Sequence, residues 1–272
     1  MKIHNCEQRS EEWKKIRLGK ATASHFKAIM ADGVGRKDYM ERLVDERITG
    51  QRQDTFENAA MRWGTQTEPQ AKTYYAAERN ITIQEVGFIE FEDVPVGASP
   101  DGIIGDDGQI EIKCPNTSTH KRWAKAGVLP PEHNAQVQGQ LWVYGRDWCD
   151  FVSFDPRVPT NPMFCIRVER DEDYITELCR KVTTFVDEML ELETQVRAGQ
   201  AKLSPKQADA MSYDMDIEEE WHKANDKRIR GMCRNGLVRS YRETKGFLTP
   251  IPSHIKDIMD GDVDYIIDGQ MT

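Results

Sequence analysis

The chain has 272 residues, of which 38% are hydrophobic and 31% are charged, and its formal net charge at pH 7 is −9. This composition excludes collagen-like order and extensive disorder, and the acidic balance argues against a uniformly basic nucleic-acid coat. No apolar run approaches the roughly 20 residues that a membrane span needs, and the first residues carry no apolar signal core, so we expect a cytoplasmic protein without membrane partners.

Helical patterns dominate the first third of the chain. Residues 10–31 favour helix, with Ser10 as a plausible start and a second start at residues 22–24, capped by Thr22 or Ser24. Residues 36–49 form a charged amphipathic pattern, and residues 55–79 form a longer one. Pro69 predicts a kink or a restart in the last of these, because proline removes a helix hydrogen bond.

The middle of the chain alternates strands with helices. We predict strands over 86–91, 94–99, 102–104, 109–113, 148–154 and 163–168. We predict helices over 119–126, 133–145 and 171–197. This order predicts an α/β fold in which a central mixed β-sheet is flanked by helices.

The composition changes near residues 198–206, which we interpret as a linker. The chain is therefore predicted to have a domain over residues 1–200 and a C-terminal extension over residues 201–272, with one helix around 215–230. The acidic end of the extension lacks the closing Glu of a calcium loop, so a solvated acidic tail is the favoured interpretation.

One short segment carries most of the chemistry. Asp101 and the glycine after it form a turn sequence, as does the Asp-Asp-Gly at 106–108, and together they predict a hairpin that returns Asp101 beside Glu111. Residues two apart on a strand share a face, so Glu111 and Lys113 point the same way. Burying these three charges without a metal or mutual pairing would cost several kcal/mol per ion, so the arrangement needs a compensating reason.

Two carboxylates and an ammonium at a strand end have the pattern of a hydrolytic metal site. Mg²⁺ and Mn²⁺ prefer oxygen ligands, which makes Asp101, Glu111 and the main-chain carbonyl of Ile112 candidate ligands. A bound metal activates water and stabilises charge on a phosphoryl oxygen, and Lys113 would support the developing anion. A Glu-x-Lys strand is usually a solvated face, but the apolar flanks and Pro115 favour the functional interpretation.

Two further patterns point to phosphate chemistry. On the helix 133–145, Gln136, Gln140 and Tyr144 share one face, which fits either a water or phosphate site or an ordinary polar face. A basic turn containing Arg17 leads to Ser24 at a possible helix start, and such starts bind anions. Taken alone, the second pattern is better explained by a capped surface helix.

With all three patterns in view, the chain resembles the lambda-exonuclease-like (YqaJ) viral recombinase family, within the PD-(D/E)xK nuclease superfamily. The resemblance covers about residues 7–195, and any single motif is weak while their order is specific. It is carried by Trp13…Arg17-Leu18-Gly19, Thr22-Ala23-Ser24, Trp63-Gly64…Glu68, Ser99-Pro100-Asp101-Gly102, Glu111-Ile112-Lys113-Cys114-Pro115 and Ala135-Gln136-Val137-Gln138. It implies a restriction-endonuclease-like nuclease core.

The resemblance also implies an activity. The family digests one strand of linear double-stranded DNA 5′→3′ and leaves 3′ single-stranded tails for recombination by strand annealing. For this chain that implies Mg²⁺, with Mn²⁺ as a possible substitute, and double-stranded DNA ends as substrate. The same resemblance implies a single-strand annealing protein as partner and a ring-shaped homotrimer. It also implies a phage or prophage origin in a bacterial host.

Site residues follow from the resemblance position by position. Asp101, Glu111 and Glu68 would bind metal, and Lys113 would be catalytic. The residues near the 5′-phosphate would be Arg17, Ser24 and Ser99, with Gln136 in the active-site pocket. Gln140 and Tyr144 also match a Gln-x-x-x-Tyr motif of related nucleases, so the choice of functional glutamine stays open.

Two alternatives are kept. The first is a structure- or sequence-specific DNA endonuclease. The second is a non-catalytic DNA-end-binding recombination scaffold, which the intact Asp/Glu/Lys trio disfavours. Under any of these, the acidic total requires that lysine and arginine gather along a local DNA channel.

Overall fold

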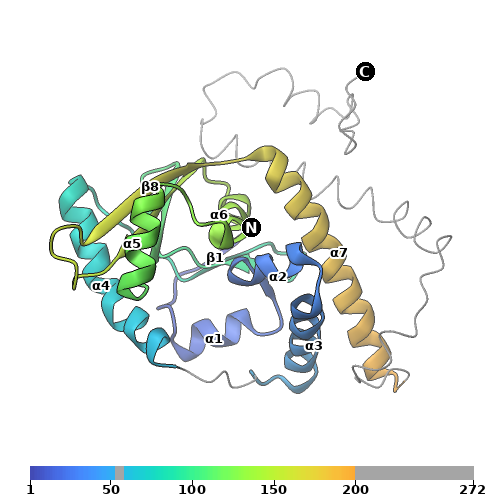
Figure 1. Ribbon diagram of the computed structural model, residues 1–272. Helices are drawn as coiled ribbons and strands as arrows, with labels where there is room; N and C mark the ends of the chain where they lie inside the picture. Colours follow the sequence, from blue (N-terminus) through green and yellow to red (C-terminus); the bar gives the residue numbers. More distant parts are fainter. Residues whose placement is uncertain (53–57, 200–272) are drawn as a thin grey trace, which may run out of the picture.

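A computed structural model describes residues 1–52 and 58–199 of the chain (Figure 1). The helices are α1 (Glu11–Arg17), α2 (Phe26–Ala31), α3 (Val34–Thr49), α4 (Ala59–Arg79), α5 (Thr117–Ala126), α6 (Pro131–Tyr144) and α7 (Glu172–Arg197), with a short 3₁₀ turn, η1 (Ala23–His25), before α2. The strands are β1 (Lys2–His4), β2 (Ala21–Thr22), β3 (Phe88–Glu90), β4 (Val96–Ala98), β5 (Gly102–Ile104), β6 (Gly108–Lys113), β7 (Trp148–Phe154) and β8 (Met163–Glu169). The predictions for residues 201–272 lie outside the described residues.

The strands form two four-stranded sheets, ordered β1-β3-β4-β2 and β5-β6-β7-β8. In the second sheet β6 runs parallel to β7, while β5 and β8 pair antiparallel with their neighbours. The prediction of an α/β fold with a mixed sheet flanked by helices is confirmed. The strands are divided between two sheets because the β3–β4 meander pairs with the short strands near the N-terminus. Gln84, in the segment before β3, forms an isolated bridge with Ile103 of β5.

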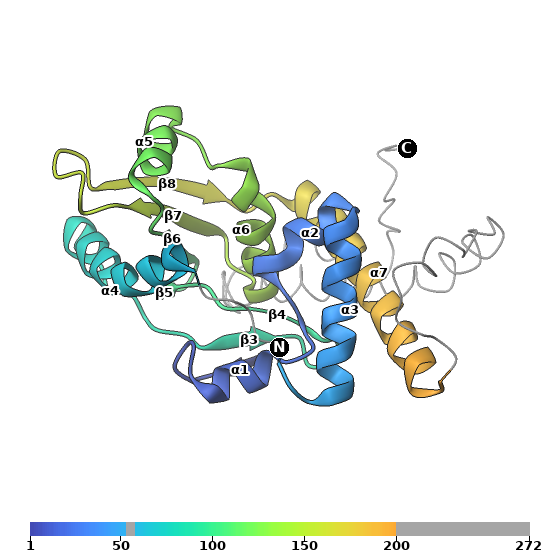
Figure 2. The ribbon, with the colours of Figure 1, turned by 60° about the horizontal axis from the view of Figure 1, so that its bottom comes forward.

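Helices cover both faces of the β5–β8 sheet (Figure 2). On one face, Ile110 and Ile112 of β6 share a buried cluster with Ala71 and Tyr75 of α4. Since side chains alternate along a strand, Glu111 and Lys113 point to the other face, toward α6. Helices α3 and α7 lie side by side at the end of the molecule away from α4 and α5 (Figures 1 and 2).

Helix α6 runs through the centre of the molecule, and every residue from Val137 to Tyr144 is buried. It begins at a proline, which favours the first helical position, and ends at Gly145, whose φ of 70° suits a left-handed cap. A side chain at Gly139 would come within 2.4 Å of the ring of Phe26. Because residue 139 is a glycine, α2 and the η1 turn before it can approach α6 closely.

Three predictions need correction. The helical pattern over 10–31 is interrupted by a strand: α1 is capped by Ser10 as predicted, but it ends at Arg17 because Gly19 adopts a φ of 64° and residues 21–22 pair with β4. The second helical start predicted at residues 22–24 is confirmed, since η1 follows Thr22 and leads into α2. Helix α4 continues through Pro69 without a restart, since its inward face is anchored on the sheet. Strand β1 was missed because three residues are too short to show a period.

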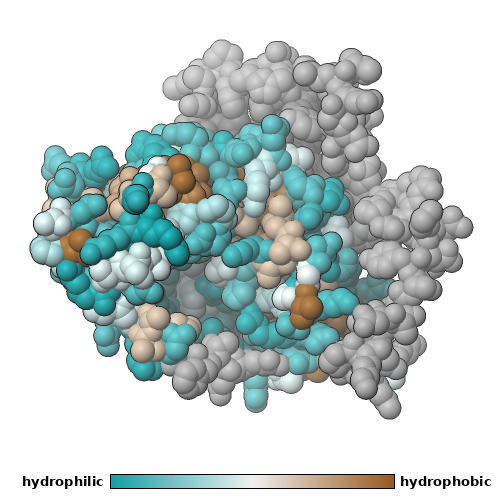
Figure 3. All heavy atoms as spheres, viewed as in Figure 1, coloured by the Kyte–Doolittle hydropathy of each residue, from teal (hydrophilic) through white to brown (hydrophobic). Residues whose placement is uncertain are grey.

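The face of the molecule in Figure 3 is mostly hydrophilic, and its hydrophobic residues occur in small separate spots. Within the described ranges, no helix is both long enough and apolar enough to cross a membrane.

Candidate active site

The β5–β6 hairpin places Asp101 beside Glu111, as the turn sequences predicted. Gly102 pairs with Ile110, and the main-chain N–H of Asp101 donates to the Ile110 carbonyl at 3.0 Å. Further along β6, the N–H of Ile112 donates to Oδ2 of Asp101 at 2.6 Å. The carboxylate thus takes the place of a strand hydrogen bond, which fixes its position against β6.

Glu111 is the centre of a buried polar cluster, with only 2% of its surface exposed. Its Oε1 lies 2.5 Å from Nζ of Lys113 and accepts a hydrogen bond of 2.6 Å from Nε2 of Gln136. Its Oε2 accepts a hydrogen bond of 2.6 Å from Nε2 of Gln140. These donors offset the cost of removing the carboxylate from water.

Negative charge crowds this end of the sheet. Burial raises the pKa of Asp101 well above its ordinary value, and the charges of Glu111 and Glu68 raise it further. Burial alone lowers the pKa of Lys113, but Glu111 and Asp101 outweigh burial and raise it, so this ammonium stays protonated at neutral pH. A cluster in which carboxylates remain this close favours an additional cation.

Glu68 comes from α4 and is held by two basic groups. Its Oε2 lies 2.5 Å from the Arg9 guanidinium, and its Oε1 lies 3.6 Å from Nζ of Lys72. It is close enough to raise the pKa of Asp101. The structure therefore brings Glu68 to the edge of the acidic cluster, while its own oxygens face cations.

The donors at this end of β6 fit a divalent cation of the Mg²⁺ or Mn²⁺ kind. Carboxylate oxygens of Asp101 and Glu111, and the Ile112 carbonyl, are hard ligands of the type these ions prefer. In the part of the chain that the structure describes, no three His, Cys, Asp or Glu side chains are grouped so that they could hold a metal ion by themselves. A donor set of two carboxylates and one main-chain carbonyl suits Mg²⁺, which binds through one or two carboxylates and keeps several waters. A cation would also hold Asp101 ionised despite its raised pKa.

The three residues predicted near the 5′-phosphate lie in one network. Nε1 of Trp13 donates to Oγ of Ser99 at 3.0 Å, and the Arg17 guanidinium lies 3.9 Å from the centroid of the Trp13 ring. Arg17 also donates to Oγ1 of Thr22 at 3.4 Å, and this oxygen is 3.2 Å from Oγ of Ser24. Arg17 is therefore linked to Ser24 through Thr22, and to Ser99 through Trp13.

This network adjoins the acidic cluster. The carbonyl of Ser99 is 3.5 Å from Nε2 of Gln140, which also binds Glu111, and Ser99 precedes Asp101 by two residues. Burial lowers the pKa of Arg17 to about 10, and neighbouring arginines add to this effect. Arg17 nevertheless carries its charge at neutral pH, so a cationic network and an acidic cluster lie next to each other.

The three residues predicted to share one face of α6 contact two different groups. Gln136 and Gln140 each hold a different oxygen of Glu111, so the structure places both glutamines at the acidic cluster. The hydroxyl of Tyr144 instead accepts a hydrogen bond of 3.0 Å from Arg146. The Gln-x-x-x-Tyr pattern is thus present on the helix, but its tyrosine contacts a different group.

Some residues of the site escaped the sequence reasoning. Gln109 is fully buried on the same face of β6 as Glu111, and its Nε2 is 3.4 Å from Oε1 of Gln140. The two-residue period of the strand could have pointed to it. His133, whose pKa is lowered to about 4 by burial and by the charge of Lys113, sits near the cluster without any metal-ligand spacing in the sequence.

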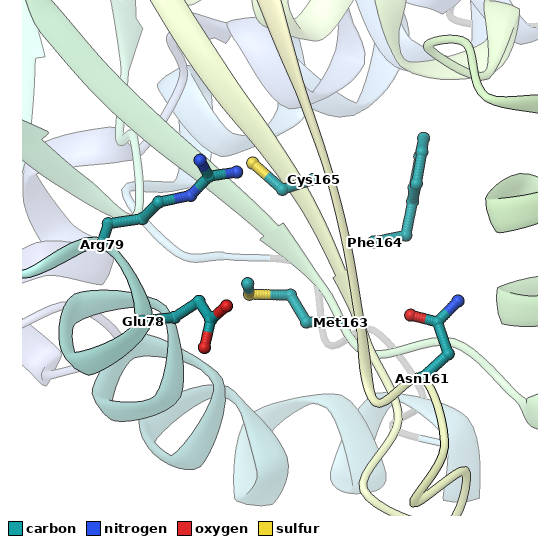
Figure 4. Close-up of a pocket in the computed structure, with 6 residues that line it drawn as sticks. All are labelled: Glu78, Arg79, Asn161, Met163, Phe164 and Cys165. Carbon is teal, nitrogen blue, oxygen red and sulfur yellow. The ribbon is translucent and has the colours of Figure 1, made fainter.

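A separate cavity of about 400 Å³ opens between the end of α4 and strand β8 (Figure 4). In Figure 4 the Arg79 side chain reaches toward the sulfur of Cys165. The lining residues are Glu78, Arg79, Asn161, Met163, Phe164 and Cys165. None of the predicted site residues is among them, so this cavity is distinct from the acidic cluster.

Comparisons with known proteins identify the family to which the chain belongs. Residues 12–147 match the YqaJ-like viral recombinase domain. The chain is 43% identical to an alkaline exonuclease (LHK-Exo) from Laribacter hongkongensis, with a TM-score of 0.67, and the match covers 72% of this chain and 100% of that one. The same exonuclease has been solved in complex with dAMP.

More distant relatives are also found. A phage-related exonuclease from Haemophilus somnus, 18% identical with a TM-score of 0.51 over 67% of this chain and 96% of that one, shares the fold. A protein of Acanthamoeba polyphaga mimivirus is 27% identical over 165 residues, 56% of this chain, and the chain spans only 30% of its length. The ExoD protein of Escherichia coli is 31% identical over 69 residues, which are 25% of this chain and 79% of that protein. The similarity of this chain to an alkaline exonuclease supports the interpretation that it is a nuclease. The chain belongs to the YqaJ-like viral recombinase family.

Proposed function

We propose that this protein is a divalent-metal-dependent exonuclease that degrades one strand of linear double-stranded DNA in the 5′→3′ direction. The observation that carries the proposal is the buried Glu111, which pairs with Lys113 beside Asp101, whose pKa is raised by burial and by the neighbouring carboxylates. The solved complex of LHK-Exo with dAMP supports it, because a nucleoside monophosphate is what stepwise exonuclease cleavage releases.

The chain's own residues supply the positioning for hydrolysis. Asp101, Glu111 and the Ile112 carbonyl would hold Mg²⁺ or Mn²⁺, with Glu68 at the edge of the site. When bound, the metal would activate water and stabilise charge on the phosphoryl oxygen. Lys113 stays charged and is held against Glu111, where it would stabilise negative charge that develops on the phosphate. Gln136 and Gln140 keep the Glu111 carboxylate in one orientation.

The adjoining cationic network gives the reaction its direction. Arg17 would bind a 5′-phosphate through paired N–H groups, and the hydroxyls of Ser24 and Ser99 would add hydrogen bonds. Since Ser99 is two residues from Asp101 and contacts Gln140, an anchored 5′-phosphate would present a nearby phosphodiester to the acidic cluster. Repeated cleavage from that anchor would release mononucleotides 5′→3′.

The biological setting is proposed on family grounds. We infer a role in recombination by strand annealing, with the 3′ tails passed to a single-strand annealing protein. A ring-shaped homotrimer around the duplex would account for processivity, and a phage or prophage gene expressed in the bacterial cytoplasm would provide the context.

Substrate topology tests the proposal directly. The purified protein with Mg²⁺ is expected to degrade linear duplex DNA and to leave covalently closed circles intact. Cleavage of closed circles would favour an endonuclease instead. Binding to DNA ends without release of any nucleotide, with or without Mg²⁺, would favour a non-catalytic scaffold.

A further inference from the structure

Arg42 on α3 carries a polar atom that the fold leaves unused. Its Nε is buried and has no hydrogen-bond partner among the described residues. The guanidinium lies 4.9 Å from the centroid of the Tyr39 ring, which is a favourable contact but satisfies no N–H group. A buried donor without an acceptor is unfavourable, so the hydrogen-bonding capacity of this guanidinium is not used up within the described residues.

The surroundings of Arg42 lead to the cationic network described above. The Tyr39 ring stacks on His25 at 4.6 Å, and its hydroxyl oxygen accepts from the N–H of Thr22 at 2.9 Å. Nδ1 of His25 is 3.1 Å from Oγ of Ser24 and 3.2 Å from Oγ1 of Thr22. Arg42 is therefore joined to Ser24 through one aromatic pair, and Ser24 is exposed to solvent.

The charges that act on His25 are all positive. Arg17, Arg42 and Arg52 all act on His25, and together with burial, the largest cause, they lower its pKa to about 4. His25 is therefore neutral at physiological pH and offers a hydrogen bond but no charge. Glu46 opposes the cations at Arg17, but one of its oxygens already accepts from the N–H of Gly19 at 2.9 Å. Cations kept this close together suit a multiply charged anion.

We propose that Arg42 is a further residue of the DNA-end site, where it binds the terminal 5′-phosphate together with Arg17 and the hydroxyl of Ser24. This inference rests on the proposed function, because it names a residue that would determine which ends are used. A terminal phosphate monoester carries about −1.5 to −2 charges at pH 7, whereas an internal phosphodiester carries only one. A second guanidinium therefore favours a phosphorylated end over a hydroxyl end and over internal positions.

Binding measured without metal tests this inference separately from catalysis. Fluorescence anisotropy in EDTA would compare the affinities of one blunt duplex with 5′-phosphate ends and with 5′-hydroxyl ends. For Arg42→Gln we expect the preference for phosphate ends to fall about tenfold, with affinity for hydroxyl ends nearly unchanged. Arg42→Lys keeps the charge but loses the planar donor fork, so it should give an intermediate preference.

Arg180→Gln is the matched control, because it removes the same charge from α7, where Arg180 pairs with Glu177 on the surface. It should retain the wild-type preference, and thermal unfolding would confirm that each variant folds. A wild-type preference in Arg42→Gln, alongside a reduced one in Arg17→Ala, would overturn the inference and leave the proposed exonuclease standing. A wild-type protein that degrades no linear duplex with Mg²⁺ would instead contradict the proposed function, whatever Arg42 does.

Discussion

Gln140 donates a hydrogen bond of 2.6 Å to Oε2 of Glu111, and the two residues are 1% and 2% exposed. The amide is itself held, since its Oε1 is 3.4 Å from Nε2 of Gln109 on the same strand as Glu111. Because Gln136 and Gln140, one turn apart on α6, donate to different oxygens of Glu111, they hold this carboxylate in one orientation. This relationship makes α6 part of the proposed metal site.

Replacing Gln140 should therefore weaken the metal site. Gln140→Ala leaves a buried carboxylate oxygen without its donor, at a cost of about 1–3 kcal/mol, so we expect cleavage to fall about tenfold or more and to require more Mg²⁺. Initial rates on linear duplex over a Mg²⁺ titration measure this. Gln138→Ala is the control on the same helix, because Gln138 contacts the main chain at Glu169 and Asp171. An unchanged Mg²⁺ requirement in Gln140→Ala would rule out the positioning role.

Arg17 should control the use of phosphorylated ends. Arg17→Ala removes a guanidinium that approaches Thr22 and stacks on Trp13, so cleavage of 5′-phosphorylated duplex should fall about tenfold or more. Cleavage of 5′-hydroxyl duplex should fall much less. Rates on the two substrates, measured in parallel, decide the point, and equal losses on both would contradict the assigned role.

Gly139 should be intolerant of any side chain. An added Cβ would lie 2.4 Å from the ring of the fully buried Phe26, so Gly139→Ala forces α2 and the η1 turn away from α6. Overpacking of this kind costs about 1–3 kcal/mol, which outweighs the better helix propensity of alanine. Thermal unfolding should show a lower Tm, and Phe26→Leu in the same chain should recover part of it. A Tm at or above wild type would show that the contact can relax.

Asp155 should stabilise the protein in a pH-dependent way. Burial opposes its ionisation, but hydrogen bonds from Arg157 and Thr117 outweigh burial and lower its pKa to about 2. An unfolded aspartate has a pKa of about 3.9, so the contribution is complete above about pH 4 and is lost as the pH falls toward 2. Asp155→Asn should cost on the order of 2 kcal/mol at pH 7. Urea unfolding at several pH values should show this deficit shrinking below pH 4, and a constant deficit would refute it.

Much of the site could be predicted from sequence because its chemistry is local. The turn residues and the two-residue period of one strand were enough to place Asp101 beside Glu111 and to put Lys113 on the same face. The 3.6-residue period of a helix likewise put Gln136 and Gln140 on one face. In both cases the spacing of neighbouring residues dictates the geometry.

What could not be predicted depends on contacts between distant segments. The break at Gly19 is decided by pairing of residues 21–22 with β4, and no local pattern reports that pairing. Arg42 lies on a charged helix, and its environment depends on Tyr39, which stacks on His25 of the η1 turn from another part of the chain. The division of the strands into two sheets has the same origin, because it depends on which distant strands meet.

The most direct test of the account is the activity of Lys113→Ala on linear duplex DNA, with each strand labelled in turn and one 5′ end phosphorylated. Wild type with Mg²⁺ should shorten the strand that carries the 5′-phosphate, release mononucleotides, and leave the 3′ strand intact, and EDTA should stop the reaction. Lys113→Ala should bind the same ends and cleave neither strand. Cleavage by Lys113→Ala at the wild-type rate would contradict the central role given to the Glu111–Lys113 pair.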